Sequence, residues 1–103
     1  MFQRSGDYPV GVPSNLIQYT TLLMMLAHVT HTEPYEFIHS VSDAHIYVDQ
    51  IPNVEELLKR DPKRLPTVTM INKKDDIFAY RSDDFELSDY DPHPPMKDIP
   101  VAV

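Results

Sequence analysis

Hydrophobic and polar positions along the chain predict strands and helices in alternation. Alternating side chains predict a strand over residues 1–10, and apolar residues at helical spacing predict a helix over 16–29. Pro13, together with Ser14 or Asn15, supplies a start signal for that helix. Its apolar side chains cover more than one stripe, so we expect a buried helix that packs on two neighbours.

The elements expected after this helix are shorter. They are a strand at 37–48, a helix at 54–60, a strand at 67–71, a helical turn at 77–80 and a strand at 85–90. The pattern predicts an α+β fold, in which a mixed β-sheet packs on one long buried helix and short helices lie at the periphery. With 103 residues, the chain is long enough for one domain, 1–103. Residues 90–103 are too rich in proline for a regular element and form a tail.

Composition and charge narrow the functional classes. The net charge of −7 disfavours a nucleic-acid-binding protein, whose surface would be basic. The chain has no cysteine, which excludes disulfides, thiolate metal ligands and a cysteine nucleophile within it, and its five histidines show no metal-binding spacing. No secretory signal is visible, and the longest apolar run, 22–27, is far shorter than the roughly 20 residues that span a bilayer. We therefore expect a cytoplasmic protein without metal, nucleic acid or membrane partners.

Candidate chemistry lies first at the amino-terminal end. The guanidinium of Arg4, with the hydroxyl of Ser5 and the nearby Asp7, fits an anion site, because arginine presents donors that match phosphate. A surface ion pair between Arg4 and an acidic side chain is the alternative. The amide of Asn15 can donate and accept, so it could read the imide edge of a pyrimidine; the alternative is that it caps the helix.

A second set of candidates lies on one face of the strand predicted at 37–48. Asp43, His45 and Tyr47 alternate along this face. Imidazole and phenol groups could form hydrogen bonds with a sugar hydroxyl. The alternative is that they pack in a core with their polar ends satisfied, as tyrosine and histidine commonly do.

Several stretches together resemble the C-terminal part of the thymidylate synthase family. The resemblance covers the whole chain in the family's order, and its most specific motifs are QRSGD at 3–7, GVPSN at 11–15, SDAHIYVDQ at 42–50, YDPHP at 90–94 and the final PVAV. The family methylates deoxyuridylate at carbon 5 and uses 5,10-methylenetetrahydrofolate as the carbon donor and reductant. The resemblance thus implies the family's α+β fold, present here in part.

The resemblance also implies roles for individual residues. Arg4 and Ser5 correspond to residues that hold the nucleotide phosphate, and Asn15 corresponds to the amide that reads uracil. The other roles are a folate contact at Asp7, contacts to the 3′-hydroxyl at His45 and Tyr47, and closure of the folate site by the terminal carboxylate at Val103. Arg4, Asp7 and Asn15 would support catalysis.

The chain departs from the family pattern in one decisive respect. The family's catalytic cysteine lies upstream of the Arg-Ser pair, whereas this chain contains no cysteine, and Ser5 has no evident base that could activate it instead. We therefore expect a truncated or split enzyme that is inactive alone and that forms a homodimer or associates with an N-terminal half. The alternatives are a non-catalytic nucleotide-binding or assembly module and a deoxycytidylate hydroxymethylase relative, which Asn15 disfavours because that family carries an aspartate there.

Overall fold

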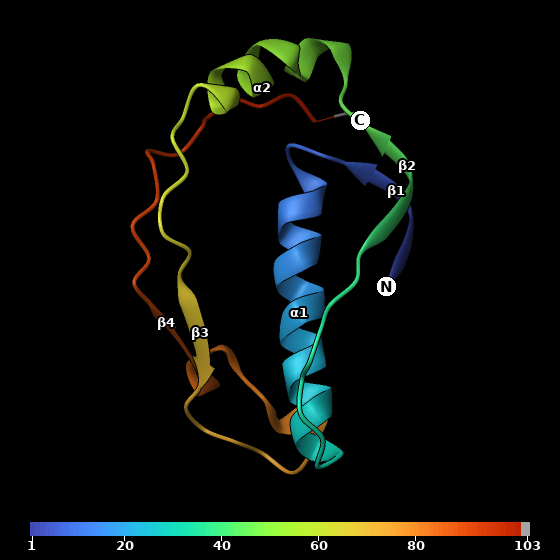
Figure 1. Cartoon of the computed structure of the whole chain (residues 1–103), viewed down its shortest axis with the longest axis vertical. Coiled ribbons are helices and arrows are strands. Elements are labelled where there is room, and N and C mark those ends of the chain that lie inside the picture. Colours follow the sequence, from blue (N-terminus) through green and yellow to red (C-terminus); the bar gives the residue numbers. More distant parts are fainter. Residues whose placement is uncertain (102–103) are drawn as a thin grey trace.

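The computed structural model describes residues 1–101 and forms an open arrangement around one long helix (Figure 1). Figure 1 shows α1 along the middle, β1 and β2 on one side, β3 and β4 on the other, and α2 at one end. The predicted order of strands and helices is confirmed. The elements are β1 (Phe2–Asp7), α1 (Gly11–Val29), β2 (Ser40–His45), α2 (Ile51–Leu58), β3 (Thr67–Met70) and β4 (Phe85–Ser88).

Strands β1 and β2 form a parallel pair whose geometry positions the candidate site. Their register sets Ser5 beside Asp43 and Asp7 beside His45. Parallel strands cannot be joined by a tight turn, and α1 provides part of the long connection between them. The carboxyl ends of both strands therefore lie at one edge of the pair, where the chain leaves β1 to begin α1.

Helix α1 begins earlier than its sequence predicts. Its first residue is Gly11, and the residue before it, Val10, makes no side-chain capping bond. The backbone N–H of Val10 instead donates to Asp7 Oδ1 at 3.3 Å, so β1 supplies a carboxylate at the helix start. The predicted cap at Ser14 or Asn15 is therefore wrong, because both residues lie inside the helix.

The strands form two sheets rather than the single mixed sheet that was predicted. The first is the parallel pair β1–β2, and the second is the antiparallel pair β3–β4, in which Met70 lies opposite Phe85. The two pairs lie on opposite sides of α1 (Figure 1), and the helix separates them. The small antiparallel pair is held further by Asp84, whose carbonyl accepts from the backbone N–H of Ile71 at 2.9 Å.

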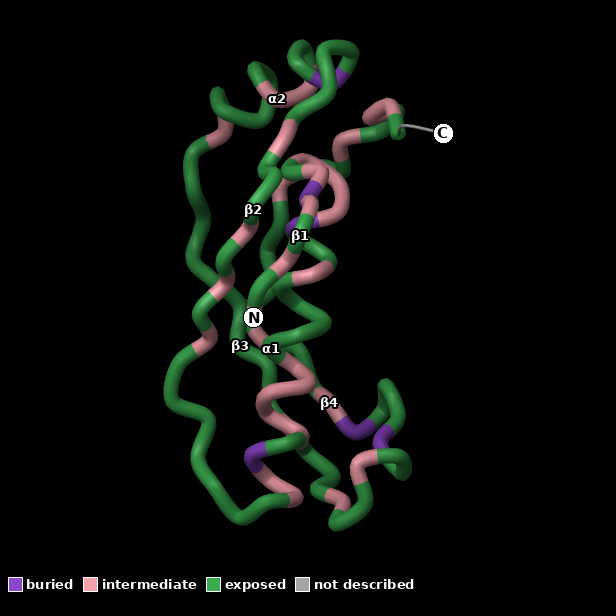
Figure 2. The backbone as a smooth tube through the Cα atoms, turned by 90° about the vertical axis from the view of Figure 1, so that its right-hand side faces the viewer, coloured by how far each residue is buried: buried purple, intermediate pink, exposed green. Residues whose placement is uncertain are grey.

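The prediction of a buried central helix is wrong for residues 1–101. Within α1 only Val12 and Ala27 are buried, whereas Ile17 is 70% exposed. Most of the backbone in Figure 2 carries the colour of exposed residues. The radius of gyration is 16.1 Å, compared with about 13 Å for a compact domain of this length. The described chain therefore leaves much of the apolar surface of α1 without cover.

The proline-rich tail runs back along the segment that follows α2. Arg60 donates to the carbonyl of Pro94 at 2.9 Å, and Lys63 pairs with Asp91 at 2.9 Å. The His93 ring lies 2.8 Å from the carbonyl of Asp61. These contacts hold the tail against residues 60–63. As predicted, the described part of the tail forms no helix or strand. Among residues 1–101, no helix is both long enough and apolar enough to cross a membrane.

Candidate functional site

The candidate site lies where β1 and β2 end and α1 begins. In parallel β–α–β arrangements, ligands commonly bind at the carboxyl ends of the strands. Ser5 and Asp7 come from the end of β1, His45 ends β2, Tyr47 follows it, and Asn15 lies in the second turn of α1. The structure thus brings five of the predicted site residues to one edge of the parallel pair.

Gln3 joins the two strands to the helix. Its amide nitrogen donates to Asn15 Oδ1 at 2.9 Å and to the carbonyl of Ser5 at 2.7 Å. Its amide oxygen lies 2.9 Å from Nε2 of His39. Gln3 and His39 were not predicted as site residues, although each shares a strand face with predicted ones: Gln3 with Ser5 and Asp7, and His39 with His45. The alternation of side chains along each strand was the sequence signal that could have identified Gln3 and His39.

The polar face of β2 continues this network. Ser5 Oγ lies 3.4 Å from Asp43 Oδ2, and Nδ1 of His45 lies 3.5 Å from Asp43 Oδ1. The rings of His45 and Tyr47 meet edge to face, with their centroids 5.0 Å apart. Asp43 is well exposed, whereas the His45 side chain is largely covered. These contacts orient the imidazole and phenol side by side at the end of β2.

Asp7 connects the strand end with the tail through Gln50. Gln50 Nε2 donates to Asp7 Oδ2 at 3.0 Å and to the carbonyl of Pro100 at 2.8 Å. Gln50 Oε1 accepts from the backbone N–H of Tyr47 at 2.9 Å. The Gln50 side chain is 0% exposed. One buried amide therefore links β1, the end of β2 and the tail.

Two glycines lie at this edge, and Gly6 is the one at a close approach of β1 to α1. A Cβ at Gly6 would lie 3.0 Å from Val12 Cγ2, which is tighter than ordinary packing. A Cβ at Gly11 would lie 3.8 Å from both Asn15 Oδ1 and the Asp7 Cβ. A side chain at position 6 would therefore crowd the contact between β1 and the first turn of α1. Gly11 marks how near the Asp7 and Asn15 side chains lie to each other.

Arg4 and Val103 stand apart from the connected residues. Arg4 is exposed on β1, and within residues 1–101 its side chain makes no hydrogen bond or ion pair, so the alternative of an intramolecular surface pair is wrong for this part of the chain. Val103 lies outside the described residues. The alternative role of Asn15 as a helix cap is also wrong, since its side chain bonds to Gln3.

An apolar groove lies elsewhere, between α1 and the β3–β4 pair. It has a volume of about 490 Å³, and its walls include Ile17, Val68, Phe85 and Leu87. None of the predicted site residues lines it. Within the described residues, no group of three or more His, Cys, Asp or Glu side chains could hold a metal ion. The predicted site residues at the edge of β1–β2 therefore lie apart from this apolar groove.

Comparisons with known proteins point to one family. The sequence model of one protein family, described as thymidylate synthase, matches residues 1–103. A human protein described as thymidylate synthase is 39% identical over 97 residues, which is 94% of this chain and 31% of the human protein. The chain therefore spans about a third of the length of this relative.

Proposed function

The chain belongs to the thymidylate synthase family, and from that membership we propose that it forms the deoxyuridylate-binding part of a thymidylate synthase. The complete enzyme would convert deoxyuridylate to thymidylate in the cytoplasm, with 5,10-methylenetetrahydrofolate as co-substrate. One observation supports this assignment above others. Ser5, Asp7, Asn15, His45 and Tyr47 lie together at the carboxyl end of the parallel β1–β2 pair.

The phosphate would be held by Arg4 and Ser5. Arg4 is exposed on β1 without an intramolecular partner among residues 1–101, so its guanidinium is available for an anion. Ser5 makes only a long contact of 3.4 Å to Asp43, and its hydroxyl can turn toward a phosphate oxygen at little cost. The charge of Arg4 supplies the stronger part of this contact.

The uracil ring would be read by Asn15. An imide edge offers one N–H donor between two carbonyl acceptors, and a primary amide complements it with one oxygen and one nitrogen. Gln3 donates to Asn15 Oδ1 and thereby fixes which end of the amide is the oxygen. That oxygen keeps a second lone pair for the imide N–H, and the Asn15 nitrogen can donate to a ring carbonyl.

The sugar and the folate would use neighbouring residues of the same edge, since Asp7 lies beside His45 in the strand register. His45 and Tyr47 lie side by side and could both bond to a 3′-hydroxyl. The Asp7 carboxylate accepts from Val10 and Gln50 and keeps lone pairs for a donor on the pterin. Val103, at the end of the tail, would help to close the folate site.

The reacting nucleophile would come from outside these 103 residues. The family's reaction begins with a thiolate attack on the pyrimidine, and this sequence contains no cysteine. We therefore expect no methyl transfer by the chain alone. The exposed apolar surface of α1 favours association with a second copy or with an N-terminal half that carries the cysteine.

Two other functions are weaker candidates. A non-catalytic nucleotide-binding or assembly module is favoured by the absence of cysteine. A deoxycytidylate hydroxymethylase relative is disfavoured because an amide at position 15 suits the imide of uracil better than the amidine edge of cytosine. Turnover by the chain mixed with an N-terminal half would exclude the non-catalytic module.

Calorimetric titration tests the proposed function directly. The chain should bind deoxyuridylate, and Arg4→Ala should weaken that binding roughly ten- to hundredfold, since one charge-assisted contact is lost. Deoxyuridine, which lacks the phosphate, should bind both proteins equally. Arg64→Ala is the matched control, because Arg64 is 82% exposed and distant from β1 in sequence. A folded chain that binds no deoxyuridylate would refute the proposal.

A further inference from the structure

Gln50 is a buried amide whose side-chain partners come from distant parts of the chain. Gln50 and Asp84 are the two buried polar residues among residues 1–101. The Gln50 amide donates to Asp7, which lies 43 positions earlier, and to the carbonyl of Pro100, which lies 50 positions later. A buried amide is costly unless its donors and acceptor are satisfied, and here all of them have partners.

The tail depends on this amide beyond the region of its other side-chain contacts. Arg60, Lys63 and the carbonyl of Asp61 hold the tail up to Pro94. Among residues 95–101, the bond from Gln50 to Pro100 is the one side-chain hydrogen bond that the described structure records. The backbone at Asp98 has φ 61°, a left-handed turn just before the bonded carbonyl. Gln50 is therefore the anchor for the last described residues.

We propose that Gln50 is a positioning residue that couples the docking of the tail to the orientation of the Asp7 carboxylate. Its two N–H groups are divided between Asp7 Oδ2 and the Pro100 carbonyl. When the tail leaves, one buried N–H loses its acceptor, and the amide must turn or admit water. Either change loosens the bond that holds Asp7. Oδ2 of Asp7 is thus held firmly only while the tail is docked, whereas Oδ1 keeps its bond to the backbone N–H of Val10.

This coupling rests on the proposed function for its meaning, since Asp7 and the tail are the two proposed folate contacts of the chain. A single amide would assemble both contacts together, before the folate arrives. Deoxyuridylate would not depend on the same bonds to Asp7 and Pro100, because Tyr47 is the one proposed nucleotide contact that bonds to Gln50 among residues 1–101. That bond uses the amide oxygen and not its N–H groups. Gln50 would therefore affect the folate side of the site more than the nucleotide side.

The Gln50→Glu variant distinguishes the roles of the amide oxygen and the amide N–H groups. A glutamate keeps an oxygen that can accept from the Tyr47 backbone N–H, but it offers no N–H to Asp7 or Pro100 at neutral pH. The carboxylate would also repel Asp7. Gln18→Glu is the matched control, because Gln18 is an exposed residue of α1. It introduces the same charge away from the tail.

Tail docking can be measured with a spin label. The chain has no cysteine, so Val101→Cys supplies a single labelling site on a residue that is 60% exposed. We expect an immobilised label with Gln50 and with Gln18→Glu. Gln50→Glu should shift the docking equilibrium toward a mobile label roughly tenfold, as expected for a lost buried hydrogen bond. Equal mobility in Gln50 and Gln50→Glu proteins would overturn the proposal.

A second measurement does not depend on a variant at Gln50. Hydrogen exchange of the Gln50 side-chain amide should be slow in the full chain and roughly tenfold faster when residues 100–103 are deleted. Unchanged exchange would overturn the coupling. Deoxyuridylate titration of the same samples tests the proposed function separately, because absent binding would refute it. The mobility of the label and the exchange rate of the amide decide the role of Gln50.

Discussion

The amide of Gln3 donates to Asn15 Oδ1 at 2.9 Å and so ties the first half of β1 to the second turn of α1. The same Gln3 amide lies 2.9 Å from His39 through its oxygen, which extends the tie to the residue just before β2. The orientation of the Asn15 amide is therefore set by the protein before any ligand binds.

We predict that Asn15→Asp changes the base preference. A carboxylate cannot donate to a uracil carbonyl, but it can accept from the amino group of cytosine. Deoxyuridylate should bind roughly ten- to hundredfold more weakly, and deoxycytidylate should bind more tightly. Calorimetry with both nucleotides measures the ratio. Asn53→Asp in α2 introduces the same charge as a control, and an unchanged ratio in Asn15→Asp would contradict the proposed reading of the base.

Removal of the Tyr47 hydroxyl should weaken the binding of a nucleotide that carries a 3′-hydroxyl, and should not affect a nucleotide that lacks it. The edge contact between the His45 and Tyr47 rings, at 5.0 Å, survives in Tyr47→Phe. We expect a loss of about 1 kcal/mol for deoxyuridylate and none for its 2′,3′-dideoxy analogue. Tyr19→Phe on α1 is the control. A similar loss with both nucleotides would show that the hydroxyl acts on the fold instead.

Gly6→Ala should destabilise the chain by about 1 kcal/mol, because the new methyl group would lie 3.0 Å from Val12 Cγ2. Gly11→Ala is a matched comparison, since its methyl group would meet its neighbours at an ordinary 3.8 Å. That change should be neutral or stabilising by up to about 1 kcal/mol, since alanine favours the helix. Urea unfolding of both variants measures the difference, and equal stabilities would argue against a tight contact between β1 and α1.

Asp84 should make the stability of the β3–β4 region depend on acid pH. The backbone N–H of Arg81 donates to its carboxylate at 2.8 Å, and this bond, aided by the charge of Lys74, lowers the pKa of Asp84 although the residue is buried. A lowered folded-state pKa stabilises the fold above the unfolded pKa of about 4, and the contribution is lost as the pH falls below that value.

Thermal unfolding at pH 7 and at pH 3 tests this expectation. Asp84→Asn should lower the Tm at pH 7, and the difference from the unmodified chain should shrink in acid. Asp83→Asn changes the exposed neighbour in the same short helical turn and should have little effect at either pH. A Tm difference for Asp84→Asn that is equally large at both pH values would exclude charge as its cause.

Ile17→Glu should reduce self-association if α1 packs against another copy. Ile17 is 70% exposed on α1 and lines the apolar groove beside β3 and β4. Sedimentation should show a smaller assembly for this variant, whereas Leu58→Glu, on the 79% exposed Leu58 of α2, should leave it unchanged. Equal sedimentation of Ile17→Glu and the unmodified chain would place the contact elsewhere.

Local patterns predicted the order of the elements, and the structure brings five of the candidate site residues to one edge of β1–β2. The alternation over 37–48 places the partly covered His39, Val41 and His45 on one face, although Asp43 and Tyr47 of the same face are exposed. Side-chain contacts between elements were not predictable in the same way. Gln50 carries no local sign that it reaches both Asp7 and Pro100, since these partners are brought near it only by the fold.

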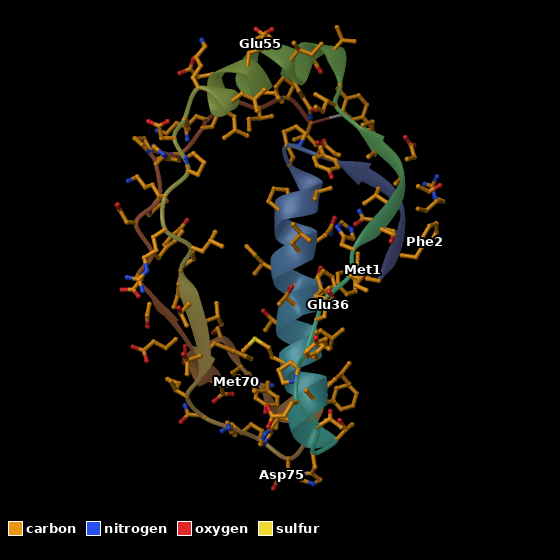
Figure 3. All side chains as sticks on the ribbon, viewed as in Figure 1. Met1, Phe2, Glu36, Glu55, Met70 and Asp75 are labelled. Atoms are coloured by element: carbon orange, nitrogen blue, oxygen red, sulfur yellow. The ribbon has the colours of Figure 1, made fainter. Side chains whose placement is uncertain are left out.

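Two of the errors concern α1, namely where it begins and how far it is buried. Pro13 is an ordinary start signal, yet the helix begins at Gly11 because Asp7, from β1, binds the backbone N–H of Val10. The apolar sequence of α1 predicts a buried helix. A local pattern shows that a helix has apolar surface to cover, but it does not show which segment, of this chain or of another, covers that surface. Figure 3 shows labelled Phe2 directed away from the helix, so β1 also presents apolar surface outward.

The separation of the strands into two pairs has a consequence for how the molecule opens. Because β1–β2 and β3–β4 share no strand, hydrogen bonds in one pair can break without any in the other being lost. Amide protection should therefore divide into two classes with different opening free energies, one for each side of α1. Nucleotide would slow exchange in the β1–β2 class alone, and a partner on the far side of the helix would slow the other.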